Sequence, residues 1–131
     1  MRCVVDSDVV IAALDEHDAH YRAATRGLRA LADDDLLLSV VSYAEVLVQP
    51  AQDDETMRRA LDALAILDLE LVAPTPAIAR DAARIRALGV SLPDAFAMAT
   101  ARARGATLAT FDRDVRRALP RAGIELARSV R

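Results

Sequence analysis

Four acidic side chains, far apart in the sequence, stand beside apolar segments where ionised groups are uncommon. Asp6 closes the apolar run at the start of the chain, and Asp112 follows the mostly apolar residues 108–111. Glu45 and Asp94 lie within apolar stretches of helical character. An ionised carboxylate at a half-buried position is costly unless something compensates its charge. We therefore expect the fold to gather these four carboxylates around a cation.

The choice of cation follows from the ligand atoms. Clustered carboxylates raise one another's pKa unless a cation is present. A site made only of oxygen ligands, with no Cys or His nearby, favours Mg²⁺ or Mn²⁺ over zinc. One or two such ions can lower the pKa of a bound water and orient it toward a phosphodiester. The residue types thus predict metal-dependent phosphodiester hydrolysis.

The elements that must position these acids alternate along the chain. Strands are expected near residues 2–6, 36–40, 69–73, 106–110 and 124–127. Helices are expected within residues 8–32, over 42–49, 54–67, 76–88 and 93–104, and as a short turn from residue 113. This alternation predicts an α/β fold with a parallel sheet and helices on both faces. The carboxyl ends of parallel strands share one edge, where open α/β sheets bind ligands, so Asp6 and Asp112 are expected there.

Length and composition limit the alternatives. The 131 residues, 53% of them hydrophobic, predict a single domain over residues 1–131. The apolar runs are too short to span a membrane and no basic-then-apolar leader opens the chain, so a soluble cytoplasmic protein with no membrane partner is expected. Aromatic residues make up only 3% of the chain, which argues against extended base-stacking platforms. All 17 basic residues are arginines, which excludes lysine Schiff-base chemistry.

The net charge of −3 conceals an uneven distribution. Residues 1–101 carry nine arginines and 17 acids, whereas residues 102–131 carry eight arginines and three acids. A basic C-terminal third beside an acidic cluster could steer a phosphate backbone toward a metal-filled site. Ordinary solvated positions explain the same arginines equally well.

Four ordered motifs carry a resemblance to a known family. They occupy residues 5–12, 42–46, 92–101 and 108–114. Together they resemble the PIN domain, and in order and spacing they are most similar to VapC-type toxins over essentially the whole chain. The resemblance implies a Mg²⁺- or Mn²⁺-dependent endoribonuclease, often a homodimer. It also implies a cognate antitoxin whose C-terminal segment occupies the acidic groove.

The resemblance assigns roles to particular residues. Asp6, Glu45, Asp94 and Asp112 match the acidic quartet of the family, and Thr110 matches a small polar position beside the last acid. We expect Asp6, Asp94 and Asp112 to bind the metal, directly or through water. Glu45 is expected to complete the metal shell or to orient the attacking water.

Several neighbouring polar residues have more than one interpretation. The hydroxyls of Ser7 and Thr110 are expected to hydrogen-bond the carboxylates or the scissile phosphate. Asp8 stands where the family more often has Asn or Ser, and it either caps the following helix, which we favour, or adds a charge near the metal. Asp114 is either a helix-start anion or a further metal ligand.

His17 and His20 lie three residues apart, a spacing that metal-binding pairs also use. No third ligand stands near them in the sequence, and acidic residues surround them. A solvated face is therefore the expected role of both histidines.

Two other functional classes fit parts of the sequence. A strand that ends in Asp6-Ser7-Asp8 also begins haloacid dehalogenase-like phosphatases, in which the first Asp attacks phosphorus. This chain has no lysine for such a pocket, and Glu45 would have no role in it. A catalytically inert PIN-fold module that only binds protein or RNA is the second alternative. The intact quartet argues against it, because clustered anions do not help to bind a polyanion.

A partner follows from the same charges. The guanidinium of an antitoxin arginine could enter the carboxylate cluster and exclude the metal, since its fork matches a carboxylate in bidentate fashion. Apolar helices in the N-terminal half, around residues 12–14 and 61–67, could hold an antitoxin helix or a dimer face, although core burial explains them as well.

Overall fold

A computed structural model describes residues 1–130 and contains a central four-stranded sheet. Its strands are β1 (Arg2–Val5), β2 (Asp35–Ser39), β3 (Glu70–Val72) and β4 (Thr107–Ala109). They lie in the order β3-β2-β1-β4, and every neighbouring pair is parallel. The expected α/β fold with a parallel sheet is confirmed, and β1 is a central strand, so the residue that follows it lies in the middle of the carboxyl edge.

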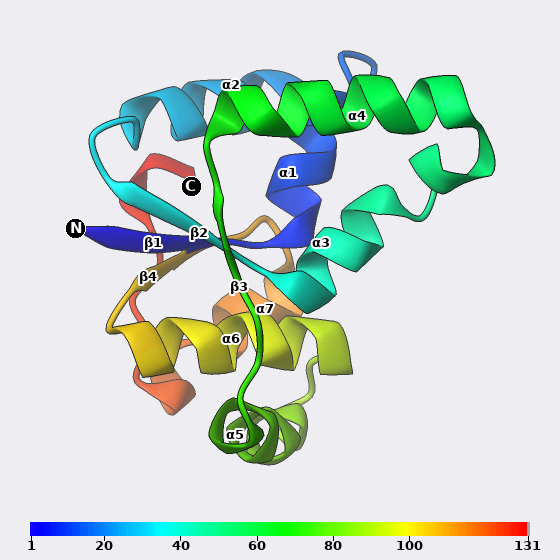
Figure 1. Cartoon of the computed structure of the whole chain (residues 1–131). Coiled ribbons are helices and arrows are strands. Elements are labelled where there is room, and N and C mark those ends of the chain that lie inside the picture. Colours follow the sequence, from blue (N-terminus) through cyan, green and yellow to red (C-terminus); the bar gives the residue numbers. More distant parts are fainter. Residues whose placement is uncertain (131) are drawn as a thin grey trace.

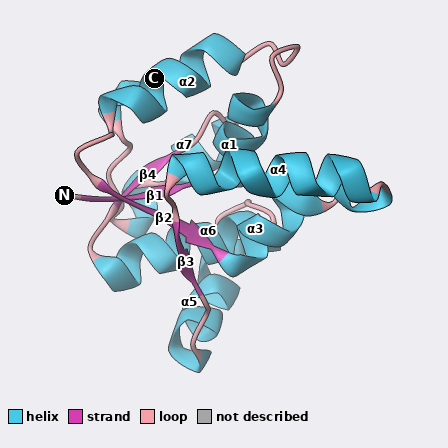
Figure 2. Ribbon diagram, turned by 45° about the horizontal axis from the view of Figure 1, so that its top comes forward, coloured by secondary structure: helices cyan, strands magenta, loops and turns pink. Residues whose placement is uncertain are grey.

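Seven α-helices within the described residues enclose the sheet, as Figure 2 shows. Their bounds are α1 (Ser7–Leu14), α2 (Tyr21–Ala30), α3 (Val40–Leu47), α4 (Asp54–Leu67), α5 (Pro76–Arg86), α6 (Leu92–Arg104) and α7 (Arg113–Ala118). Figure 1 shows α1, α2 and α4 on one side of the strands and α5, α6 and α7 on the other. Helices therefore cover both faces of the sheet, as expected.

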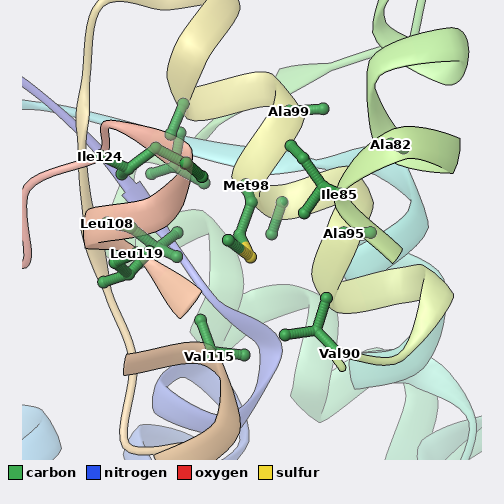
Figure 3. Close-up of a cluster of buried hydrophobic side chains, with 14 of the residues drawn as sticks. Ala82, Ile85, Val90, Ala95, Met98, Ala99, Leu108, Val115, Leu119 and Ile124 are labelled. Carbon is green, nitrogen blue, oxygen red and sulfur yellow. The ribbon is translucent and has the colours of Figure 1, made fainter. Parts of the chain in front are cut away.

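Strand alternation divides the interior into two hydrophobic cores. Val4, Leu37 and Leu108, which are aligned across β1, β2 and β4, point toward α5, α6 and α7. Cys3 and Val5 point the opposite way, toward α1, α2 and α4. Figure 3 shows Met98 of α6 within the first core. Because successive side chains of a strand face opposite sides, a strand buried on both faces must be apolar throughout.

Local capping places Asp94 at the start of α6. The Ser91 hydroxyl accepts a hydrogen bond from the Asp94 backbone N–H at 3.3 Å, and Pro93 occupies the first turn, where its missing N–H costs nothing. Gly89, with φ of 95°, ends the preceding segment in the left-handed region that glycine adopts most readily. The helix that carries Asp94 therefore begins at a position set by its own sequence.

The strand expected at residues 124–127 is wrong. Only Leu126 pairs with β4, through an isolated parallel bridge to Leu108. The chain then forms a short 3₁₀ helix (Arg128–Val130) that packs on α2. Gly27 of α2 permits this close approach, because a Cβ atom there would lie 2.8 Å from the Val130 side chain and 2.9 Å from the Ser129 carbonyl oxygen. Packing on α2 thus takes the place of further pairing.

No helix in residues 1–130 combines the length and the apolar character that crossing a membrane requires.

Candidate metal-dependent nuclease site

Asp6 stands at the centre of the carboxyl edge of the sheet. It follows β1, caps the N-terminus of α1 and is only 1% exposed. Its backbone N–H donates to the Ala109 carbonyl at the end of β4 at 2.9 Å, and its Oδ1 accepts from the Ser7 N–H at 2.9 Å. The end of the strand ladder therefore fixes this carboxylate where β1 and β4 meet.

The other three members of the predicted quartet come from the starts of two helices and from the body of a third. Asp94 lies on the first turn of α6, which packs against β1. Asp112 follows β4 and caps α7, where its Oδ1 accepts from the Val115 N–H at 2.9 Å. Glu45 lies on α3, which contacts both α1 and α6. The structure brings all four toward one edge of the sheet.

The electrostatics show that these acids are close enough to affect one another. Burial raises the pKa of Asp6 well above its ordinary value, and the charges of Asp8 and Asp94 raise it further. Burial likewise raises the pKa of Asp94, and the nearby charge of Asp112 adds to that rise. Burial raises the pKa of Glu45, with a further contribution from Asp94 that the nearby Ser7 hydroxyl opposes. The four predicted acids therefore form one interacting cluster.

Thr110 ties the cluster together from the end of β4. Its hydroxyl is fully buried and donates to Asp6 Oδ2 at 2.9 Å. The Thr110 hydroxyl oxygen also accepts a hydrogen bond from the Asp112 backbone N–H at 3.1 Å. Ser7 is also buried, and its nearby hydroxyl lowers the pKa of Glu45. Thr110 therefore makes the expected contact with a carboxylate, and contact of either hydroxyl with a scissile phosphate stays a prediction.

Asp8 does not cap α1, so that expectation is wrong. Asp6 is the cap, and Asp8 on the first turn reaches across to the β4–α7 connection instead. Its Oδ2 accepts from the Phe111 backbone N–H at 2.9 Å and lies 3.4 Å from the Thr110 hydroxyl. Burial raises the pKa of Asp8, and the charges of Asp112 and Asp94 also raise it. This fifth carboxylate therefore belongs to the cluster and holds the segment that carries Asp112.

The contact from Asp8 to Phe111 leads to a stability prediction. Asp8→Ala leaves the Phe111 N–H without its partner, and we expect it to lower the free energy of unfolding by about 1–3 kcal/mol. Asp8→Asn keeps an oxygen acceptor of the same shape and should lose far less. Urea unfolding of both variants without metal measures the difference. Equal losses in the two variants would show that the hydrogen bond does not hold this connection.

Two buried oxygen atoms in the cluster have no hydrogen-bond partner. They are Asp8 Oδ1 and Glu45 Oε1. A buried acceptor left unpaired is costly, and mutual repulsion adds to that cost. Among residues 1–130, no group of three or more His, Cys, Asp or Glu side chains is placed so that it could hold a metal ion. The oxygen-only donors and the unpaired atoms nevertheless fit a hard divalent cation, for which these side chains must draw closer together.

Several C-terminal arginines form ion pairs within the protein, which the charge count alone did not indicate. Three form ion pairs at 3.4–3.6 Å: Arg102 with Asp81, Arg104 with Glu70 and Arg117 with Asp114. Such exposed pairs contribute little stability, but they offset charges expected to steer RNA. Asp114 lies on the first turn of α7, where a helix-start anion is expected, and it pairs with Arg117. Arg131 lies outside the described residues.

Arg116 supports the site, a role that the sequence analysis missed. Its Nε donates to the Thr110 carbonyl at 2.9 Å, and its Nη2 donates to the Val130 carbonyl at 2.6 Å. The guanidinium therefore links the end of β4 to the C-terminal segment. Its place one turn after Asp112 on a short helix is the only sequence signal that could have indicated this role.

The two histidines differ from each other. His17 is highly exposed and lies 3.8 Å from Glu16, in agreement with a solvated face. His20 is also exposed, but its ring stacks on Phe111.

Comparison with known proteins agrees with this geometry. The sequence matches the family described as PIN domain over residues 3–119. No curated protein matches the chain.

Solved structures share the fold at low sequence identity. FitAcB from Neisseria gonorrhoeae superposes with a TM-score of 0.75 at 21% identity, covering 97% of both chains. VapC20 from Mycobacterium tuberculosis, described as a sarcin–ricin loop cleaving toxin, has a TM-score of 0.70 at 21% identity and covers 88% of this chain and 94% of its own. DNA-bound VapBC from Salmonella typhimurium has a TM-score of 0.70 at 20% identity, covering 96% of both.

Proposed function

This chain belongs to the PIN domain family, and on that premise we propose that it is a Mg²⁺- or Mn²⁺-dependent endoribonuclease that acts as the toxin of a toxin–antitoxin pair. One observation carries the proposal most strongly. A partly buried carboxylate cluster at the carboxyl edge of the sheet contains two buried oxygen atoms without hydrogen-bond partners, and such atoms are suited to bind a divalent cation. The similarity to VapC20, which is described as a toxin, supports the biological setting.

The four carboxylates of the predicted quartet would have different roles. Asp6, Asp94 and Asp112 would hold the metal, and Glu45 would complete its shell or orient the attacking water. A bound Mg²⁺ or Mn²⁺ would supply a water of lowered pKa and charge stabilisation for the phosphodiester. The buried Thr110 hydroxyl holds Asp6 and Asp112 together, because it donates to the Asp6 carboxylate and accepts from the Asp112 backbone N–H. These fixed contacts limit the reorganisation needed at the moment of reaction.

A groove beside the cluster suits the antitoxin. It has a volume of about 520 Å³, lies between α1, α3 and α4, and includes Glu45 among its lining residues. Ile11, which is 40% exposed, and Leu14 contribute apolar surface. An apolar antitoxin segment lying here would reach the carboxylates at one end, where an arginine could pair with them. Such occupancy would compete with the metal.

The remaining expectations complete the proposal. Residues 1–131 form one nuclease domain, the active protein is a homodimer, and it works on cytoplasmic RNA. Sedimentation of the purified protein with and without an antitoxin peptide would test the assembly.

Incubation with RNA tests the proposed activity directly. The purified chain should cleave RNA internally when Mg²⁺ or Mn²⁺ is supplied, and EDTA should stop the reaction. Asp62→Asn, which changes an exposed acid on α4, should cleave like the wild type and controls for the loss of one negative charge. RNA that stays intact in excess Mg²⁺ and Mn²⁺ would support the inert binding module instead.

A further inference from the structure

Two aromatic rings stack beside the carboxylate cluster. The ring centroids of His20 and Phe111 lie 4.6 Å apart, and their planes differ by 16°. Phe111 is the residue between Thr110 and Asp112, both of which belong to the site. His20 comes from the connection between α1 and α2 and is exposed. The stack therefore joins an exposed loop to the segment that carries a proposed metal ligand.

His20 occupies the N-cap position of α2, where a residue with a capping side chain is usual. Its side chain, however, makes no capping hydrogen bond. The other six α-helices in the described chain have Asp, Ser or Thr at this position, each with a side chain that accepts a backbone N–H. Those residue types are the usual caps because they satisfy a free donor. The His20 ring stacks on Phe111 and makes no capping hydrogen bond. Stabilisation of α2 by capping therefore does not explain why a histidine occupies this position.

Phe111, one of the two stacked residues, is fixed by its backbone and by its side chain. The Phe111 backbone N–H donates to Asp8 Oδ2 at 2.9 Å, and the Phe111 side chain packs against the core that includes α1 and α2. Phe111 covers one face of the His20 ring, and His20 as a whole is nevertheless exposed. The His20 loop has its own support, since the His20 backbone N–H donates to Asp18 Oδ1 at 2.8 Å. A flat ligand could add a third layer without disturbing the two rings.

We propose that His20, supported by Phe111, is a nucleobase-stacking subsite for a nucleotide next to the cleaved bond. The inference rests on the proposed ribonuclease function. Each nucleobase has a π-face, and sequence-specific recognition of RNA targets unpaired bases that stack on aromatic side chains, histidine included. The scarcity of aromatic residues excludes an extended platform but is compatible with a single subsite. The subsite would place one base while the carboxylates act on the neighbouring phosphate.

Steady-state cleavage of a short RNA with a mapped cleavage site tests this subsite. His20→Ala should raise KM about five- to tenfold, the lower part of the range for loss of one stacked base. Its kcat should stay within about twofold, because the contact is made equally in the ground and transition states. His20→Phe should retain the wild-type KM, since it restores a flat ring. His17→Ala, an exposed histidine outside the stack, is the matched control and should change neither value.

Abasic substrates separate stacking from a merely structural role. Removing one base at a time beside the cleaved bond should raise the wild-type KM at one position, and His20→Ala should show no further penalty there. If His20→Ala has the wild-type KM, or raises KM equally on intact and abasic RNA, the subsite is overturned. If His20→Phe behaves like His20→Ala, stacking is also overturned. If the wild-type protein cleaves no RNA, the proposed ribonuclease function is itself overturned, and the subsite inference that rests on it is overturned too.

Discussion

Asp6→Asn is expected to reduce metal-dependent RNA cleavage at least about a hundredfold, because even residues that only support metal ligands cost 10- to 100-fold when replaced. The same substitution should raise the unfolding temperature of the metal-free protein by roughly a few degrees. Asp6 is 1% exposed, and burial together with the charges of Asp8 and Asp94 raises its pKa. Asn removes the buried charge and keeps an oxygen that can cap α1.

Opposite changes in activity and stability distinguish a functional charge from a structural one. Thermal unfolding in EDTA and a cleavage assay in Mn²⁺ on the same preparation measure both. Asp62→Asn serves as the control and should change neither quantity. An Asp6→Asn protein that is less stable than the wild type without metal would show that Asp6 maintains the fold, and would remove this reason for expecting a cation.

The metal-free protein should become more stable as the pH is lowered from about 8 toward about 5, against the usual trend for acid unfolding. Burial raises the pKa values of Asp6, Asp8, Glu45 and Asp94 in the folded state. A carboxyl with a raised folded pKa binds its proton more tightly when folded. Its stabilisation is complete below the unfolded pKa of about 4 and is lost as the pH rises through the folded value.

A divalent cation should reverse this slope. Bound metal favours the ionised carboxylates, so its stabilisation is largest near neutral pH and declines on acidification. Unfolding temperatures measured over this pH range in EDTA and in Mn²⁺ provide the comparison. Asp53 contributes in the opposite direction, because a hydrogen bond from Thr56 lowers its pKa, but Asp53 is fully exposed. A metal-free protein that loses stability steadily from pH 8 to pH 5 would contradict the expected coupling.

Elements with strong local signals could be predicted from the sequence. The apolar runs identified β1 to β4, because a parallel sheet covered on both faces requires apolar side chains on both sides of each strand. The helix expected over residues 93–104, with Pro93 in its first turn, placed Asp94 at the start of α6. The gathering of the four acids at one edge followed from these element ends, since strands β1 and β4 are neighbours.

Features that depend on side-chain reach could not be predicted in this way. Asp8 lies on the first turn of α1, where a cap is the local expectation, but its carboxylate crosses to the Phe111 N–H. The sequence indicates only that Arg116 is one of the C-terminal positive charges, whereas its guanidinium donates to two backbone carbonyls. The strand expected at residues 124–127 failed because the C-terminal segment packs on Gly27 of α2. Each error arose from a tertiary contact that no local pattern records.

Binding of Mn²⁺ measured by calorimetry is the most direct test of the central claim, that this carboxylate cluster exists to hold a divalent cation. The wild type should show saturable binding with release of protons, because the raised pKa values of Asp6 and Asp94 must fall when the metal enters. Asp94→Asn should lose that binding, and Asp62→Asn should keep it. Absence of saturable binding in the wild type, or unchanged binding in Asp94→Asn, would contradict the claim.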